Sequence, residues 1–181
     1  TTIGVVKILT NAKLPTGHTR AGTGFVIADK LVITNYHVIE GATRVAVGLM
    51  DNSVIETDGQ RHIDPARDIA IIHTEKKLAN IDPLPLLESY PQQLVEVVAM
   101  GHPLGFHYSM TKGVVSAIRD APEIGPQAHF DGRWVQTDAA ISSGNSGGPL
   151  FTQEGIVVGM NSLGISGEID EDLETFAQNI N

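Results

Sequence analysis

The segment Gly144-Asn145-Ser146-Gly147-Gly148-Pro149 carries the side chain best suited to covalent chemistry. A serine hydroxyl is a weak nucleophile, so it reacts only where a base and an acyl carbon approach it closely. Glycines on either side leave room for that approach and allow backbone N–H groups to point toward a developing oxyanion. If Ser146 has a base within reach, this pattern predicts acyl transfer.

Two upstream residues are candidates for the base and for the acid that orients it. His37 follows directly after an apolar run, 31–34, where a strand end can present a side chain rigidly to a cleft. Asp68 precedes the apolar run 69–72, so we expect its carboxylate to be partly buried. A buried carboxylate needs donors, and a histidine Nδ1–H supplies one and gains a fixed tautomer in return. The alternatives are a structural histidine and a turn aspartate, and Asp64, followed by proline, fits a turn better than Asp68 does.

The order of these residues along the chain excludes two other arrangements. The pattern G-x-S-x-G also describes the nucleophile elbow of α/β hydrolases, where the histidine follows the serine. Here the last histidine is His129, so that order is excluded. The subtilisin order needs an acid well ahead of its histidine, and Asp29 leaves little room before His37. The order His37, Asp68, Ser146 matches the chymotrypsin-type arrangement.

Short apolar runs separated by turn signals recur along the chain and predict an all-β protein. We expect strands at residues 5–9, 24–28, 31–34, 45–50, 54–57, 69–73, 94–100, 110–118, 134–137, 149–151 and 156–162. Asp58-Gly59 and Asp131-Gly132 are hairpin-type turn signals. A connector with three prolines, 79–92, separates halves of five or six strands each, which favours two small antiparallel barrels or a sandwich.

The C-terminal segment has a different periodicity. Leu173, Phe176, Ala177 and Ile180 follow the spacing i, i+3, i+4, i+7, and acidic residues crowd the first turn. We therefore predict a short C-terminal helix that packs its apolar stripe against the body of the protein.

The composition limits the classes of partner and cofactor. The chain has 181 residues, 41% of them apolar, and a formal net charge of −9. With no basic stripe to neutralise phosphates, we expect no nucleic-acid partner. The chain has no cysteine, which excludes disulfides and thiolate chemistry. Gly22-x-Gly24 lacks a third glycine and precedes a strand, so we expect no cofactor, and we expect no metal. We find no signal peptide, and no apolar run of the roughly 18 residues that a membrane span needs.

Six segments together resemble, in order, blocks of the HtrA/Deg-type serine proteases. They are 22–27, 34–39, 68–70, 101–105, 136–141 and 144–150, and the similarity extends from about residue 22 to about residue 162. The resemblance implies two six-stranded antiparallel β-barrels of the chymotrypsin type with the site in the cleft between them, endopeptidase activity and no cofactor. It covers the protease domain, and the PDZ modules that usually follow have no counterpart in this chain. We accordingly divide the chain into an N-terminal barrel, 1–85, with His37 and Asp68, and a C-terminal barrel, 86–181, with Ser146.

Carried over onto this sequence, the resemblance assigns a role to each candidate residue. Ser146 would be the nucleophile, His37 the general base and then acid, and Asp68 the residue that orients the imidazole. The N–H groups of Gly144 and Ser146, on either side of Asn145, would form the oxyanion hole. Trypsin-like zymogens have an aspartate in the place of Asn145 to capture a new N-terminal amine. Because an amide cannot form that ion pair, we expect activation without an N-terminal cut.

The residues around the candidate site also predict a substrate class. Ala140 and Ile141, five to six residues before Ser146, are expected to line the primary specificity pocket. Because neither is charged, we expect a small aliphatic residue before the cut. The backbone of Asn161-Ser162-Leu163 is expected to pair with an extended substrate strand. The predicted function is a serine endopeptidase that cleaves unfolded or extended polypeptides through an acyl-enzyme. The alternative is a peptide-binding, chaperone-like module with a collapsed oxyanion hole and little turnover.

The resemblance further suggests a role in protein quality control, an extracytoplasmic location such as the periplasm, and assembly into a trimer. The N-terminal residues 1–13 lack the aromatic side chains that we associate with trimer contacts in this family. The trimer is therefore an expectation from the resemblance alone.

Overall fold

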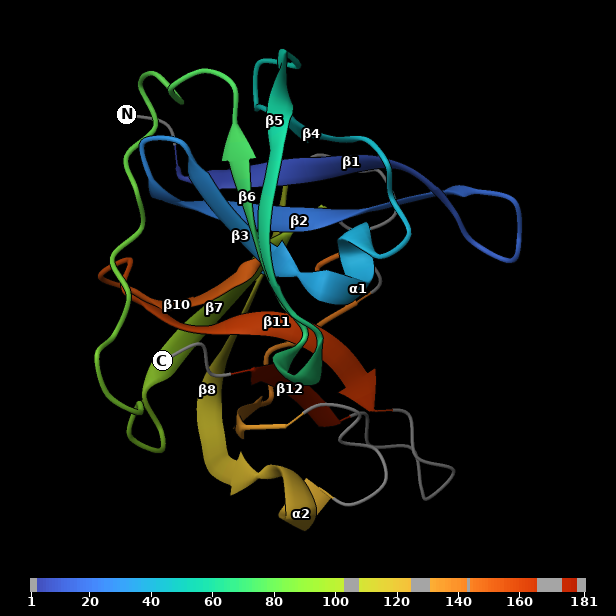
Figure 1. The fold of residues 1–181 in the computed structure, drawn as a ribbon. Helices are drawn as coiled ribbons and strands as arrows, with labels where there is room; N and C mark the ends of the chain where they lie inside the picture. The colour runs from blue at the N-terminus through green and yellow to red at the C-terminus, as the bar shows by residue number, and fades with distance from the viewer. Residues whose placement is uncertain (1–2, 103–107, 125–130, 143, 166–173, 179–181) are drawn as a thin grey trace.

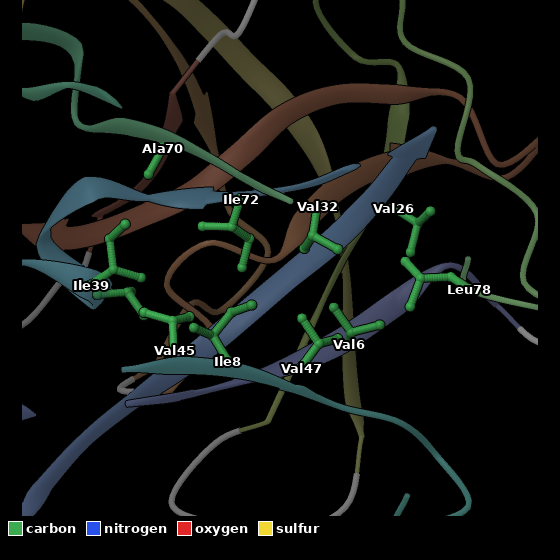
Figure 2. Packing of buried hydrophobic residues seen from close by; sticks show 11 residues of the cluster. Val6, Ile8, Val26, Val32, Ile39, Val45, Val47, Ala70, Ile72 and Leu78 are labelled. Atoms are coloured by element: carbon green, nitrogen blue, oxygen red, sulfur yellow. The ribbon is translucent and has the colours of Figure 1, made fainter. Parts of the chain in front are cut away.

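The computed structural model describes residues 3–102, 108–124, 131–142, 144–165 and 174–178. Six strands of the N-terminal half close into an antiparallel barrel in the order β1-β2-β3-β6-β5-β4 (Figure 1). They are β1 (Val5–Lys13), β2 (Thr19–Ala28), β3 (Leu31–Asn35), β4 (Val45–Gly48), β5 (Val54–Asp64) and β6 (Ile69–Thr74). Valine and isoleucine side chains fill the interior of this barrel (Figure 2), because β-branched residues pack well on pleated strands.

The C-terminal half forms a second closed barrel, in the order β10-β11-β12-β9-β8-β7. Its strands are β7 (Glu96–Gly101), β8 (Ser109–Asp120), β9 (Arg133–Thr137), β10 (Pro149–Thr152), β11 (Val157–Ile165) and β12 (Glu174–Gln178). Figure 1 shows the first barrel, blue to green, above the second, yellow to red. The prediction of an all-β fold with two six-stranded antiparallel barrels is confirmed.

A separate cluster of buried side chains joins the two barrels. It takes Val5, Phe25 and Ile33 from the first barrel and Met100, Val157 and Met160 from the second. We call this cluster the seam. Tyr108, just before β8, packs against the seam and donates its hydroxyl to the carbonyl of Val5 at 2.8 Å. Burial raises the pKa of Tyr108 to about 12, because an apolar environment disfavours the phenolate.

The connection between the barrels, 75–95, is bonded to both of them. The N–H of Leu84 donates to Val26 of β2 at 2.9 Å, and the N–H of Leu87 donates to Val157 of β11 at 2.8 Å. The domain boundary that we placed after Pro85 falls between these two contacts. The connector therefore runs along the seam from one barrel to the other, in keeping with its proline-rich sequence.

The predicted C-terminal helix is wrong. Residues 174–178 form strand β12, which pairs with β11 and β9 and closes the second barrel. Leu173 and Ile180, two of the four residues of the helical pattern, lie outside the described residues. A strand at this position supplies the hydrogen bonds that β9 and β11 would otherwise lack along one edge, and this long-range requirement overrides a short amphipathic pattern.

Neither Asp-Gly pair closes a two-residue hairpin. Asp58-Gly59 lies inside β5, where the register with β6 shifts between Thr57 and Arg61, so this pair forms a bulge in one long strand. Asp131-Gly132 leads into β9, which pairs with β8 across a longer connection containing α2 (Ala121–Ile124). The prediction of hairpin turns at these pairs is therefore wrong, although Gly59 and Gly132 both have the positive φ that favours glycine.

The remaining helices are single turns. They are α1 (Tyr36–Ile39), which follows β3, and the 3₁₀ turn η1 (Pro65–Arg67), which precedes β6. Within the described part of the chain, no helix has the length and apolar character to cross a membrane.

Candidate active site

The backbone around Asp68 brings two strand ends of the first barrel together. Asp64 caps η1 by accepting the N–H of Arg67 at 3.1 Å, so Asp64 is the turn aspartate. Asp68 ends that turn in the left-handed region, with φ 53°. Its carbonyl accepts the N–H of Tyr36 at 2.9 Å and the side-chain amide of Asn35 at 3.2 Å. These bonds fix the start of α1 against the start of β6.

His37, on α1, faces the carboxylate of Asp68 directly. Its Nδ1 lies 2.7 Å from Oδ2 of Asp68, and its backbone N–H donates to Oδ1 at 2.8 Å. The Asp68 side chain is fully buried, while about a third of the His37 side chain is exposed. Because a carboxylate oxygen only accepts hydrogen bonds, Nδ1 carries the proton and Nε2 is left as a proton acceptor. The hydroxyl of Ser162 lies 3.5 Å from the same Oδ2 and adds a further donor.

Ser146 lies on a tight loop just before β10, and this loop is hydrogen-bonded to the second barrel. Within the loop, Gly148 donates to the carbonyl of Asn145 at 2.9 Å, and Gly147 donates to the carbonyl of Asn161 on β11 at 2.8 Å. The hydroxyl of Ser146 donates to the carbonyl of Ser162 at 3.3 Å. This contact places the Ser146 hydroxyl beside β11.

Gly147 shows why the loop needs glycine after the serine. Its φ of +84° lies in the left-handed region. A Cβ there would collide with the carbonyl oxygen of Thr23 and the hydroxyl of Thr34. Both neighbours belong to the first barrel, so the loop of the second barrel packs directly against backbone of the first.

Thr23 of β2, in the first barrel, also holds the serine loop. Its hydroxyl donates to the carbonyl of Gly144 at 2.7 Å and accepts the N–H of His102 at 3.0 Å. Its backbone N–H donates to the carbonyl of Ser146 at 2.9 Å. The peptide that joins Gly144 to Asn145 is therefore held by Thr23 at its carbonyl and, at its N–H, by the carbonyl of Ser142 at 3.0 Å. The orientation of the neighbouring N–H groups thus depends on contact between the two barrels.

The structure brings His37, Asp68 and Ser146 together across the barrels. His37 and Ser146 line one pocket of about 260 Å³. The other lining residues are Leu14, Arg20, Ala21, Val38, Glu40 and Gly144. The lining of this pocket therefore comes from the start of β2 with the turn before it, from α1 and the residue after it, and from the serine loop.

The residues predicted to bind substrate lie in different environments. Ala140 is exposed, whereas Ile141 packs into the core of the second barrel. Asn161 is buried, and its N–H and carbonyl bond to Gly148 at 2.7 Å and Gly147 at 2.8 Å. Ser162 is the residue whose carbonyl meets Ser146, and Leu163 follows it within β11. Their part in substrate recognition stays a prediction.

The sequence patterns assigned no role to Thr23, Arg20 or the hydroxyl of Ser162. Thr23 offers a signal in hindsight, because it is a polar residue in a glycine- and apolar-rich strand, and a buried hydroxyl needs partners. The partners themselves lie 79 and 121 residues away along the chain. No local pattern identifies contacts at that separation.

Comparisons with known proteins agree with this architecture. Residues 22–160 match the family described as trypsin-like peptidase domain. The chain is 41% identical to "Putative serine protease HhoB" of Synechocystis sp. over 78% of this chain and 34% of that protein. It is 39% identical to "Serine protease HTRA2, mitochondrial" of Bos taurus over 82% of this chain and 32% of that protein. It is 41% identical to "Probable periplasmic serine endoprotease DegP-like" of Pseudomonas putida, over 78% and 28%. The chain thus spans about a third of the length of these curated relatives.

Solved structures have the same fold over nearly the whole chain. The active form of the Rv3671c protease from M. tuberculosis superposes with a TM-score of 0.81 and 26% identity, covering 98% of this chain and 76% of that one. An HtrA-type protease with a tripeptide gives a TM-score of 0.80 and 26% identity, covering 98% and 56%. With the family match extending from β2 into β11, this chain belongs to the trypsin-like peptidase family, and its relatives there are serine proteases of the HtrA/Deg type.

Proposed function

We propose that this chain is the catalytic part of a serine endopeptidase of the HtrA/DegP type, acting on unfolded or extended polypeptides. The observation that carries the proposal is the 2.7 Å contact between His37 Nδ1 and the buried carboxylate of Asp68, in a pocket that His37 shares with Ser146. A base with a fixed tautomer beside a serine is the arrangement that activates a hydroxyl nucleophile.

In the proposed reaction, Ser146 Oγ attacks the scissile carbonyl carbon and His37 Nε2 takes the hydroxyl proton. The N–H groups of Gly144 and Ser146 receive the developing oxyanion. The C–N bond then breaks, His37 returns the proton to the leaving amine, and an ester joins Ser146 to the acyl half. Water repeats the sequence on the ester, with His37 again as the base, and frees Ser146. Asp68 stays ionised throughout and stabilises the imidazolium.

The contact between Ser146 and Ser162 suggests how substrate binding takes part in the proposed reaction. At rest, the Ser146 hydroxyl donates to the Ser162 carbonyl at 3.3 Å. A substrate N–H that bonds to that carbonyl competes with this long bond, and a released hydroxyl is free to turn toward His37. An extended peptide therefore both occupies the β11 side and releases the nucleophile. We infer a preference for a small aliphatic residue before the cut from the uncharged Ala140 and Ile141.

The first test is covalent labelling with a fluorophosphonate probe. Wild type and Ser142→Ala should label, because Ser142 is exposed and only its carbonyl serves the serine loop. Ser146→Ala and His37→Ala should not label. Equal labelling of wild type and Ser146→Ala, or no labelling of wild type, would contradict the proposal.

The second test uses an unfolded model protein and identifies the new termini by mass spectrometry. We expect cleavage after Val, Ala, Leu or Ile and no cleavage by Ser146→Ala. Binding without cleavage by the wild type would favour the chaperone-like alternative.

The names of two of the relatives suggest where to look for the protein. One is named periplasmic and one mitochondrial. We propose an extracytoplasmic location for this chain by its similarity to the DegP-like proteins. Assembly into a trimer, and a part in protein quality control, stay predictions from the same resemblance.

A further inference from the structure

The helix that carries His37 ends too early to supply a donor for the carbonyl of His37. In a continuing α-helix the carbonyl of His37 would accept the N–H of Gly41, four residues on. The chain instead becomes extended at Glu40, with ψ 131°, and Gly41 has φ +71°. The carbonyl of Tyr36 is taken by the N–H of Glu40 at 2.9 Å, and that of Ile39 by the N–H of Ala42 at 3.0 Å. The carbonyl of His37 needs a donor from elsewhere.

Arg20 supplies that donor from β2. Its Nη1 lies 2.6 Å from the carbonyl oxygen of His37 and 3.3 Å from that of Glu40. The carboxylate of Glu40 is 3.7 Å from the same nitrogen and balances its charge. A cation that bonds the last carbonyls of a helix also complements the negative end of the helix dipole. A single guanidinium group thus supplies the hydrogen bonds that the N–H groups of the next helical turn would otherwise donate.

His37 is consequently held at both of its peptide groups. Asp68 accepts its N–H at 2.8 Å, and Arg20 donates to its carbonyl at 2.6 Å. The bonds to Asp68 and the burial of Val38 and Ile39 hold the body of α1, whereas Arg20 holds the carbonyl end of His37, where a shift of the backbone would move Nε2 relative to Ser146. We propose that Arg20 is a positioning residue for His37, a role that rests on the function proposed above.

Arg20 also lines the pocket that contains Ser146. Direct binding of substrate by Arg20 is therefore a second role, which has to be distinguished from the positioning of His37. A residue that acts through His37 affects every substrate, because His37 transfers a proton in each acylation. A residue that binds the leaving half of the peptide affects only substrates that have residues after the cut. The two roles therefore predict different responses to the length of the substrate.

The experiment compares Arg20→Met and Arg20→Lys with wild type on two substrates of the same acyl sequence. One substrate carries a small chromogenic amide after the cut, and the other carries four further residues. Arg44→Met is the matched control, since Arg44 pairs with Glu56 at 3.4 Å and does not line this pocket. We expect Arg20→Met to lower kcat about tenfold or more on both substrates with KM within about twofold. Arg20→Lys, which keeps a charged donor, should restore most of the rate.

Other results would overturn the inference. If Arg20→Met matches Arg44→Met, or slows only the longer substrate through KM, Arg20 does not position His37. The positioning role is also excluded if the rate loss equals the unfolded fraction measured by circular dichroism. Absence of turnover and of probe labelling in wild type would instead remove the proposed function itself.

Discussion

The carboxylate of Asp68 contacts His37 through both of its oxygens. Oδ1 accepts the backbone N–H of His37 at 2.8 Å, and Oδ2 lies 2.7 Å from its Nδ1. One side chain therefore fixes both where the imidazole is anchored and which tautomer it adopts. Because Asp68 is fully buried, bulk solvent does not reach either oxygen.

Asp68→Asn should abolish most activity and leave the fold intact. An asparagine that keeps the backbone contact turns its NH₂ group toward Nδ1, which forces the proton onto Nε2. The loss of kcat should reach about 10⁴-fold, the value known for the corresponding change in a type enzyme. The fold should persist because asparagine tolerates the left-handed backbone at this position, φ 53°. Steady-state kinetics and circular dichroism check both parts, and a loss under tenfold would remove Asp68 from the mechanism.

Thr23→Val should lower kcat with little change in KM. Valine keeps the shape of threonine but removes the hydroxyl that holds the carbonyl of Gly144 at 2.7 Å. The oxyanion donors then lose alignment, and we expect a loss of about 10- to 100-fold. Thr23→Ser should retain most of the rate.

The control for this variant is Thr74→Val. Thr74 is equally buried, but its hydroxyl bonds to the carbonyl of Lys76 at 2.8 Å, away from the serine loop. Its variant should lose stability and keep kcat. Equal kcat for Thr23→Val and Thr74→Val would show that the hydroxyl of Thr23 does not align the loop.

Gly147→Ala and Gly17→Ala should differ sharply in stability although both glycines have φ +84°. At Gly17 an added Cβ meets no heavy atom within 4 Å, so only the backbone cost of about 1–2 kcal/mol applies. At Gly147 the Cβ also collides with Thr23 and Thr34, and the loss should exceed about 4 kcal/mol. Urea denaturation of both variants measures the difference. Similar losses would mean that the serine loop can move away from the first barrel.

Tyr108→Phe should destabilise the protein by about 1 kcal/mol at neutral pH, because it removes the bond to the carbonyl of Val5 at 2.8 Å. The variant should also change the response to base. Burial raises the pKa of Tyr108 to about 12, so the folded state keeps a proton that the unfolded chain loses near pH 10. The native state then binds more protons, and stability falls as the pH rises from about 10 to 12. Urea denaturation across this range should give a flatter pH dependence for Tyr108→Phe, and parallel curves would contradict the assignment.

The sequence predicted the strands and the candidate residues His37, Asp68 and Ser146, because both predictions depend on local patterns. Apolar runs bounded by turn residues identify strands whatever their partners are, and His37 and Ser146 sit in motifs of six residues or fewer. The prediction of a helix around Phe176 was wrong because a local pattern does not show which strands will lie beside the segment. Its apolar spacing fits a short helix, and only the unpaired edges of β9 and β11 make it a strand.

The positions of Arg20 and Thr23 could not be predicted in the same way. Arg20 reaches a carbonyl 17 residues away, and Thr23 reaches one 121 residues away. Each contact requires the barrels, or the turn after β3, to be in place already. Local patterns identify the residues proposed to react, whereas the contacts proposed to position them form only after folding.

The seam has a consequence for how this protein can vary. Ser146 belongs to one barrel and His37 to the other, so we expect a change in packing at Phe25 to alter the distance between these two side chains even though Phe25 does not line the pocket. Its neighbours across the seam, Met100 and Met160, are the residues that can compensate. Selection for turnover therefore acts on the two barrels together. Replacing one barrel by that of a relative should lower the rate of turnover before it lowers the stability of the fold.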